Sequence, residues 1–188
     1  MDVLIQKGIQ KETAIWIPSS KSLSHRALIT AGLSSGTSRI ERLVDNEDTR
    51  ATIRCLKAMG AIVEREGEDV IVHGNGGHLQ YDGQIIDCGE SGSTLRFMIP
   101  LFALLDQKVI FQGHGRLMQR PQTVYEELFH KNGLLFEKHD DTIVIQGPLK
   151  PGDYTITGSV SSQFITCLLF AFPLMEGTST LTILPSYE

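Results

Sequence analysis

Three short polar segments of this 188-residue chain have a composition that suits the binding of anions. They are residues 19–22, 89–92 and 158–161, and each consists mostly of serine and glycine before an apolar run. Small residues let an anion approach the backbone closely, and serine adds a hydroxyl donor. If each run is a helix, its first N–H groups are unpaired and lie at the positive end of the helix dipole. The segments therefore predict sites for phosphate or carboxylate groups.

Cationic side chains accompany these segments and the link at residues 114–120. Five of them are Lys21, Arg26, Arg96, Arg116 and Arg120. The chain as a whole is acidic, with a net charge of −5, so an anion has to be held by cations gathered locally. The same balance disfavours a nucleic-acid binder that relies on bulk charge. The pattern predicts a small, multiply charged anion as the ligand.

Each of these features also has an ordinary structural explanation. A serine before a helix is most often only an N-cap, and a single lysine or arginine is most often a solvated surface charge. No Gly-Lys-Ser/Thr sequence follows Gly89–Gly92, so this segment is not a Walker A loop. The six histidines lack metal-ligand spacing with cysteines or carboxylates, so we expect no metal site. What favours an anion site is the recurrence of serine at one position of a repeat.

The repeat is marked by three equally spaced serines. Ser24, Ser93 and Ser162 each begin an apolar run that predicts a first helix. A β-rich stretch follows each run, at residues 38–43 in the first copy and 108–111 in the second. With an extended segment before each first helix, the expected unit is βαβαββ.

A second, amphipathic helix and a hairpin complete the first two copies. The second helices are expected over residues 48–59 and 121–132, with Pro121 at the first helical position of the latter and glycine just past each end. The third copy has a lead strand at residues 153–157, a first helix and a second strand before residue 188. The missing helix and hairpin predict that this copy is truncated.

The expected fold class is α/β (α+β), a pseudo-threefold ring of βαβαββ units with sheets outside and the apolar first helices inside. Residues 96–105 are hydrophobic nearly all round, which is typical of a core helix. Such a ring brings equivalent helix starts together. The expected organisation is a strand segment at 1–17, which would pack with a further domain, and one domain at 18–188 whose units are 18–80, 81–150 and 151–188.

Cysteine usage and hydropathy indicate where the protein works. Cys55, Cys88 and Cys167 are far apart, which is typical of reduced thiols rather than a disulfide framework. The apolar stretch 164–175 is too short to span a bilayer, and the N-terminus lacks the order of a signal peptide. We therefore expect a soluble, cytoplasmic protein with no membrane partner.

Four segments resemble the signature of the 5-enolpyruvylshikimate-3-phosphate synthase family. They are residues 20–28, 92–96, 120–121 and 158–164, in the family's order over nearly the whole chain. The resemblance implies an enolpyruvyl transferase-like fold of two similar domains that close on the substrates. Members of the family are a little over twice this length, so it also implies an N-terminal half whose partner is the C-terminal domain of the same polypeptide, in a monomer.

The resemblance implies transfer of the enolpyruvyl group of phosphoenolpyruvate to the 5-hydroxyl of shikimate 3-phosphate, without a metal or organic cofactor, by a glyphosate-inhibited enzyme. Lys21 would stabilise developing charge. The residues implied for shikimate 3-phosphate are Lys21, Ser22, Arg26, Ser161, Ser162 and Gln163. The residues implied for phosphoenolpyruvate are Lys21, Gly92, Arg120 and Gln163. The general base belongs to the other domain, so this chain alone is expected to be inactive.

Departures from the family pattern leave alternatives open. Glu90 stands where the family commonly has asparagine, which places a carboxylate beside the expected anion pocket, and Ser93 replaces a common threonine. The related transferase acting on UDP-N-acetylglucosamine carries a reactive cysteine in the link that here spans residues 114–120, and this link has none. A non-catalytic module that binds phosphate sugars is the alternative from another class.

Overall fold

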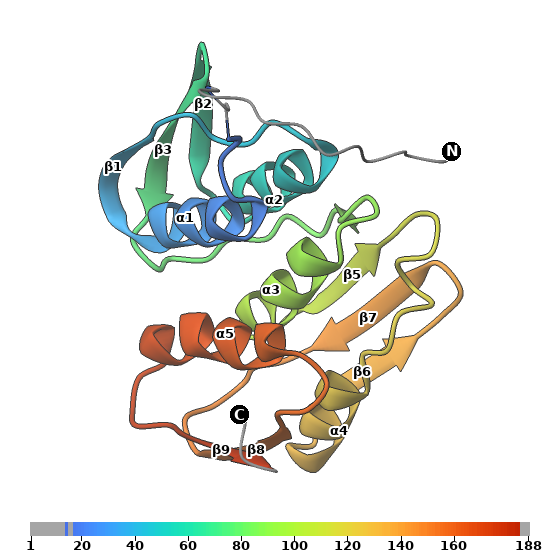
Figure 1. Cartoon of the computed structure of the whole chain (residues 1–188). Helices are drawn as coiled ribbons and strands as arrows, with labels where there is room; N and C mark the ends of the chain where they lie inside the picture. Colours follow the sequence, from blue (N-terminus) through green and yellow to red (C-terminus); the bar gives the residue numbers. More distant parts are fainter. Residues whose placement is uncertain (1–13, 15–16, 185–188) are drawn as a thin grey trace, which may run out of the picture.

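The computed structural model of the chain describes residue 14 and residues 17–184 (Figure 1). The first part of it forms two helices and a three-stranded sheet: α1 (Lys21–Leu33), β1 (Ser35–Ile40), α2 (Glu47–Ala58), β2 (Ile62–Glu66) and β3 (Asp69–Asn75). The strand order is β1-β3-β2, and both pairings are antiparallel. Asn46 caps α2 by accepting the Thr49 N–H at 2.9 Å, and Gly60, at φ +93°, turns the chain beyond the helix end.

The middle part repeats this arrangement with an added lead strand. Its elements are β4 (Ile86–Asp87), α3 (Gly92–Phe102), β5 (Lys108–Gln112), α4 (Thr123–Lys131), β6 (Leu135–Lys138) and β7 (Thr142–Gln146). The sheet order is β4-β5-β7-β6, in which only the β4–β5 pair is parallel. A parallel pair needs a crossover connection, and α3 supplies it.

The last part begins the same unit a third time. Its elements are β8 (Asp153–Thr157), α5 (Ser162–Ala171), a 3₁₀ turn (Phe172–Leu174) and β9 (Thr180–Leu184). The strands β8 and β9 pair in parallel around α5, as β4 and β5 do around α3. The element order therefore confirms the βαβαββ repeat where the chain is described. The segment expected at 1–17 lies almost entirely outside the described residues.

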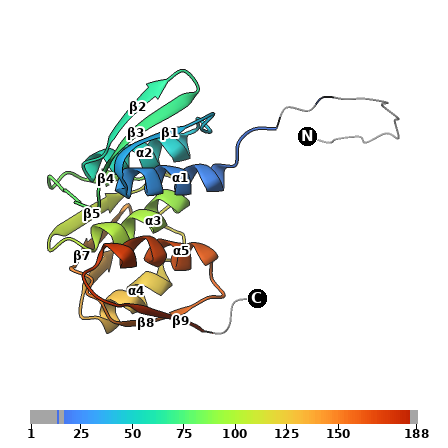
Figure 2. The same cartoon turned by 90° about the vertical axis from the view of Figure 1, so that its left-hand side faces the viewer.

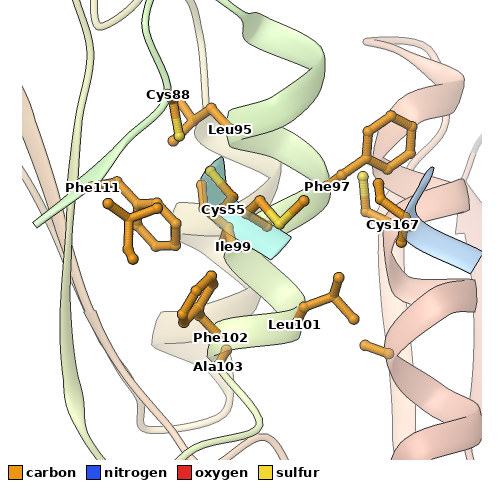
Figure 3. Packing of buried hydrophobic residues seen from close by; sticks show 14 of the residues in the cluster. Cys55, Cys88, Leu95, Phe97, Ile99, Leu101, Phe102, Ala103, Phe111 and Cys167 are labelled. Carbon is orange, nitrogen blue, oxygen red and sulfur yellow. The ribbon is translucent and has the colours of Figure 1, made fainter. Parts of the chain in front are cut away.

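The first helices α1, α3 and α5 lie next to one another, and the sheets lie around them (Figures 1 and 2). Helix α3 lies between α1 and α5, and every residue from Phe97 to Phe102 is buried. Phe102 meets Phe111 of β5 edge-on, with ring centres 5.6 Å apart (Figure 3). The ring centre of Phe97 lies 5.8 Å from that of Phe170 in α5. Each fully buried side chain of this size stabilises the fold by roughly 1.5–3 kcal/mol. The mixed α/β fold with apolar helices inside is as predicted.

The three equally spaced serines, Ser24, Ser93 and Ser162, do not occupy equivalent positions in their helices. The three first helices begin at Lys21, Gly92 and Ser162, and the preceding serine caps each of them. Ser24 is therefore the fourth residue of α1, where its hydroxyl donates to the Ser20 carbonyl at 2.9 Å. A serine in the first turn and a serine at the N-cap look alike in a sequence, because both precede the same apolar run.

Two element boundaries also differ from the prediction. Pro121 precedes α4 instead of opening it, because Gln122 is a non-helical N-cap with φ −125° and ψ 19°. The first β-rich stretch forms a strand at Ser35–Ile40 instead of 38–43. It ends there because Arg42 has a left-handed φ of 49°, which turns the chain toward α2.

Candidate functional site

The helix starts converge through a series of side-chain contacts. The ammonium of Lys21 in α1 lies 2.7 Å from the Asp48 carboxylate in the first turn of α2. The Thr94 hydroxyl in the first turn of α3 donates to the Asp48 carbonyl at 3.2 Å. The Gln163 amide nitrogen in the first turn of α5 donates to the Ser93 hydroxyl at 2.8 Å. We call the first turns of α1, α3 and α5, together with the side chains of Arg26 and Arg120, the helix-start face.

Helix α1 carries its own cations onto this face. Ser20 caps the helix by accepting the Leu23 N–H at 3.4 Å. One turn later, the Arg26 guanidinium donates to the Ser22 hydroxyl at 2.5 Å and to its carbonyl at 3.0 Å. The same guanidinium lies 5.4 Å from the centre of the Phe97 ring of α3, a cation–π distance. Ser22 and Arg26 are thus held together, beside the second turn of α3.

Asp48 belongs to the site although sequence analysis did not select it. Its carboxylate holds the Lys21 ammonium, and the Lys21 side chain is still 54% exposed. An exposed pair of this kind contributes little to folding, at most about 1 kcal/mol. Lys21 can therefore exchange Asp48 for another anion at low cost. An acidic residue in the first turn of a helix is so common that no sequence signal points to this partner.

Helix α3 has no cation in its first turn and receives one from the link before α4. Arg120 lies over Gly92, the first residue of α3, so closely that a Cβ at position 92 would be 2.5 Å from its Nη1. The Gly92 backbone is buried and has an ordinary φ, so space, not conformation, requires glycine here. A guanidinium beside unpaired N–H groups at a helix start is an arrangement that binds carboxylate or phosphate.

The first turn of α5 supplies hydroxyl and amide groups. Ser161 caps the helix by accepting the Gln163 N–H at 3.3 Å, and Ser162 is exposed beside it. The Gln163 carbonyl oxygen accepts from Arg96 at 2.8 Å while its NH₂ bonds Ser93. Gln163 thus connects α5 with α3, and it leaves the two serines at the open end of the helix.

The Arg96 side chain is half-buried and packed against other side chains instead of facing solvent. Its guanidinium lies 5.0 Å from the centre of the Phe164 ring, and its Nε is buried without a hydrogen-bond partner among the described residues. Burial lowers the pKa of Arg96 from its usual value. The chain therefore uses this cation to orient Gln163, and the cations left at the surface of the helix-start face are Lys21, Arg26 and Arg120.

Glu90 lies in the turn before α3, as expected, and its carboxylate is directed at the link. A Cβ at Gly115 would be 2.8 Å from the Glu90 carboxyl carbon, so the carboxylate rests against that glycine. The link runs from residue 113 to 122, whereas its counterpart before α2 runs only from 41 to 46. The longer link is what allows Arg120 to reach α3.

Other chemistries have little support among the described residues. No group of three or more His, Cys, Asp or Glu side chains that could hold a metal ion occurs there. Cys55, Cys88 and Cys167 are free and buried, and burial raises the pKa of Cys167 to about 12. A thiol of this kind is a poor nucleophile at neutral pH. Within the described residues no helix has the length and apolar character needed to cross a membrane.

The fold and site define a class of protein: a mixed α/β repeat protein with cations gathered on a face built from three helix starts. Comparison with known proteins identifies the class more closely. Residues 5–187 match the family described as EPSP synthase (3-phosphoshikimate 1-carboxyvinyltransferase). The chain belongs to this family.

Relatives and solved structures agree with the match. The chain is 42% identical over 179 residues to the 3-phosphoshikimate 1-carboxyvinyltransferase of Clostridium kluyveri, covering 94% of this chain and 42% of that protein. It is 39% identical over 184 residues to the enzyme of that name from Clostridioides difficile. An EPSP synthase structure from Acinetobacter baumannii has the same fold, with a TM-score of 0.79 at 24% identity over 93% of this chain. The chain spans well under half the length of the relatives it matches.

Proposed function

We propose that this chain forms one half of a 3-phosphoshikimate 1-carboxyvinyltransferase and carries most of its shikimate 3-phosphate site. The enzyme would transfer the enolpyruvyl group of phosphoenolpyruvate to the 5-hydroxyl of shikimate 3-phosphate and release inorganic phosphate. The observation that carries the proposal is the convergence of three capped helix starts with Lys21, Arg26 and Arg120 on one face. Both substrates are phosphorylated carboxylates, and this face offers N–H groups, hydroxyls and cations for them.

Each group has a role in this proposal. Ser161 and Ser162 would bind the phosphate of shikimate 3-phosphate at the start of α5, with Ser22 and Arg26 holding its ring substituents and carboxylate. Gly92 and Arg120 would bind phosphoenolpyruvate. Gln163 would lie between the substrates. Lys21 would leave Asp48 and neutralise charge that develops in the tetrahedral intermediate, which is the kind of stabilisation that contributes most to catalysis.

The second half of the enzyme would complete the site. None of the residues proposed for binding is a general base for the 5-hydroxyl, and all three described helix starts open to one side. A second domain would supply the base and exclude water, as the length of the relatives suggests. The three free cysteines are compatible with a cytoplasmic location, which belongs to the same proposal.

Titration of the ¹⁵N-labelled chain with shikimate 3-phosphate, followed by NMR, tests the proposal. We expect saturable shifts at the amides of Lys21–Arg26 and Ser161–Gln163 and none at the outer sheets. Arg26→Met should weaken this binding, whereas Arg39→Met, which removes an arginine from β1, should leave it unchanged. Shikimate and UDP-N-acetylglucosamine serve as ligand controls.

Three outcomes would contradict the proposal in whole or in part. A folded chain whose spectrum does not respond to shikimate 3-phosphate has no such site. A chain that responds equally to UDP-N-acetylglucosamine belongs to a transferase with the other substrate, or to a general module for phosphate sugars. Product formed by the chain alone would disprove the need for a second half.

A further inference from the structure

A buried polar chain connects the starts of α1 and α3 through α2. His25 Nδ1 lies 2.8 Å from the Thr52 hydroxyl, which lies 2.8 Å from the Thr94 hydroxyl. The Thr94 hydroxyl lies 2.8 Å from that of Ser91, the N-cap of α3, whose oxygen also accepts the Thr94 N–H at 3.2 Å. All four side chains are buried, with exposures of 0% or 1%. We call these four residues the buried chain.

The hydrogen bonds of the buried chain have one favourable direction. His25 Nε2 is buried and has no partner among the described residues. If Nε2 carried the proton, a buried N–H donor would be left unpaired, which is rare and costly. With the proton on Nδ1, His25 donates to Thr52, and only an acceptor lone pair is left without a partner. The Thr52 proton then goes mainly to Thr94 and the Thr94 proton mainly to Ser91, because both of these contacts are 2.8 Å long. Each hydroxyl shares its proton with the Asp48 carbonyl through a second, longer contact of 3.3 Å from Thr52 and 3.2 Å from Thr94.

The imidazole is neutral in this environment. Burial lowers the pKa of His25 to about 4 against the opposing effect of Asp48, while the charges of Lys21 and Arg26 lower it further. These three charged groups face it from α1 and α2, and Phe97 faces it from α3 at a ring distance of 6.4 Å. A neutral ring has one N–H group, so the tautomer decides whether His25 donates to Thr52 or accepts from it.

The two ends of the buried chain lie next to groups of the helix-start face. His25 precedes Arg26 in α1, and Ser91 precedes Gly92 in α3. Midway, the Asp48 carbonyl accepts from Thr94 at 3.2 Å and from Thr52 at 3.3 Å, while the Asp48 carboxylate holds Lys21. Because these bonds join α1 to α2 and α2 to α3, a shift of α1 against α3 would strain them.

We propose that His25, Thr52, Thr94 and Ser91 are positioning residues: a directed hydrogen-bond chain, beginning at an Nδ1–H tautomer of His25, that fixes the Lys21–Arg26 turn relative to the Gly92 turn. The inference deepens the proposed function, because these are the turns assigned there to the two substrates. The four side chains are buried beneath the face and act through the backbone and cations that they hold in place.

The tautomer and the position of the turns are tested first, without a ligand. Long-range ¹H–¹⁵N NMR should show the Nδ1–H tautomer of His25, and an Nε2–H tautomer would overturn the directed chain. Thr94→Val keeps the shape of the side chain but removes the hydroxyl. It should shift the amides of Lys21, Ser22 and Gly92, whereas Thr94→Ser should restore them. Unchanged amides in Thr94→Val would overturn the positioning role.

Ligand binding gives the second test. With shikimate 3-phosphate present, Thr94→Val should weaken phosphoenolpyruvate binding about 2- to 30-fold, the range usual for residues that couple two sites, and Thr94→Ser should bind as wild type does. Thr37→Val is the matched control, because the Thr37 hydroxyl also lies 2.8 Å from a histidine Nδ1, that of His73 on the outer sheet. It should leave binding unchanged.

The outcomes separate the two proposals. A wild-type protein that binds neither substrate contradicts the proposed function. The tautomer of His25 and the amide shifts of Thr94→Val still test the positioning role of the buried chain. A Thr94→Val protein that is less stable but binds both ligands normally shows that the buried chain only supports the fold. The positioning role is then wrong. Equal weakening by Thr37→Val has the same consequence.

Discussion

Helices α1 and α3 begin with the same backbone device and obtain their positive charge in different ways. Each follows a capping serine, Ser20 or Ser91. The α1 start is exposed and carries Lys21 and Arg26 on its own turns, whereas the α3 start is buried and receives Arg120 from the link before α4. The buried start has no room for a long side chain of its own. A repeat can therefore keep its backbone while one unit takes its cation from a distant part of the chain.

At the exposed start of α1, substitution of Lys21 is expected to have the largest effect on activity. In an enzyme completed by its second half, Lys21→Met should lower turnover by about 10²- to 10³-fold, because a preorganised charge next to the intermediate is lost. The free energy of unfolding should change by less than about 1 kcal/mol, since the side chain is 54% exposed. Phosphate release and chemical denaturation measure the two quantities. Lys108→Met, on β5, is the control, and normal turnover in Lys21→Met would contradict the assignment.

The pH dependence of stability tests the contact between the two helices. Burial lowers the pKa of His25 from 6.5 to about 4, so between these values the unfolded chain binds a proton that the folded chain does not. Stability should therefore be constant above pH 7 and fall as the pH is lowered from about 6.5 to 4, by up to about 3 kcal/mol. Urea denaturation across this range measures it. His25→Asn should lose this step, and His73→Asn should keep it; a step in both, or in neither, would place its origin elsewhere.

Substitution of Arg120 tests the buried start of α3. Arg120→Lys retains the charge but loses the planar group that can form two parallel bonds to a carboxylate or phosphate. The KM for phosphoenolpyruvate in the completed enzyme should rise roughly 10-fold or more, with a smaller change for shikimate 3-phosphate. Arg65→Lys is the matched control, because Arg65 lies on the outer strand β2 and pairs with Asp45. Equal changes for both substrates would show that Arg120 does not distinguish between them.

Gly92→Ala should reproduce part of the Arg120 effect. The added methyl would lie 2.5 Å from Arg120 Nη1, so the flexible guanidinium has to move. Phosphoenolpyruvate binding should weaken, by less than in Arg120→Lys, with little change in stability. A crystal structure of the variant would show the displacement. If Arg120 stays in place and the Gly92 backbone moves, the interpretation of this glycine is wrong.

The capping serines give the smallest effects and compare the two starts directly. Ser20→Ala should cost about 0.5–1 kcal/mol of stability, because its single cap bond is long, at 3.4 Å, and exposed. Ser91→Ala should cost about 2 kcal/mol, since it also leaves the Thr94 hydroxyl with one partner fewer in the core. Thermal and urea unfolding measure both. A larger loss from Ser20→Ala would reverse the comparison.

Much of the fold could be predicted from local patterns. The lead strand at 153–157 and the amphipathic second helices agree with the structure to within two residues, and a hairpin follows each second helix as predicted. Hydrophobic period, glycine after helix ends and the all-apolar α3 are properties of neighbouring residues, so a single sequence displays them. The errors arose where a local feature had two meanings, as with Ser24, Pro121 and the turn at Arg42.

The sequence by itself determined the βαβαββ repeat, the apolar inner helices and the residue types on the helix-start face, because each is displayed by the pattern of residue types within a short stretch of the chain. Only the tertiary structure decided which groups meet: Asp48 with Lys21, Arg120 with Gly92, Gln163 with Arg96 and Ser93, and His25 with Thr52. These pairs join separate elements, and their geometry is set by how helices pack in the core. Packing depends on the shapes of many side chains at once, and no spacing within the sequence records it.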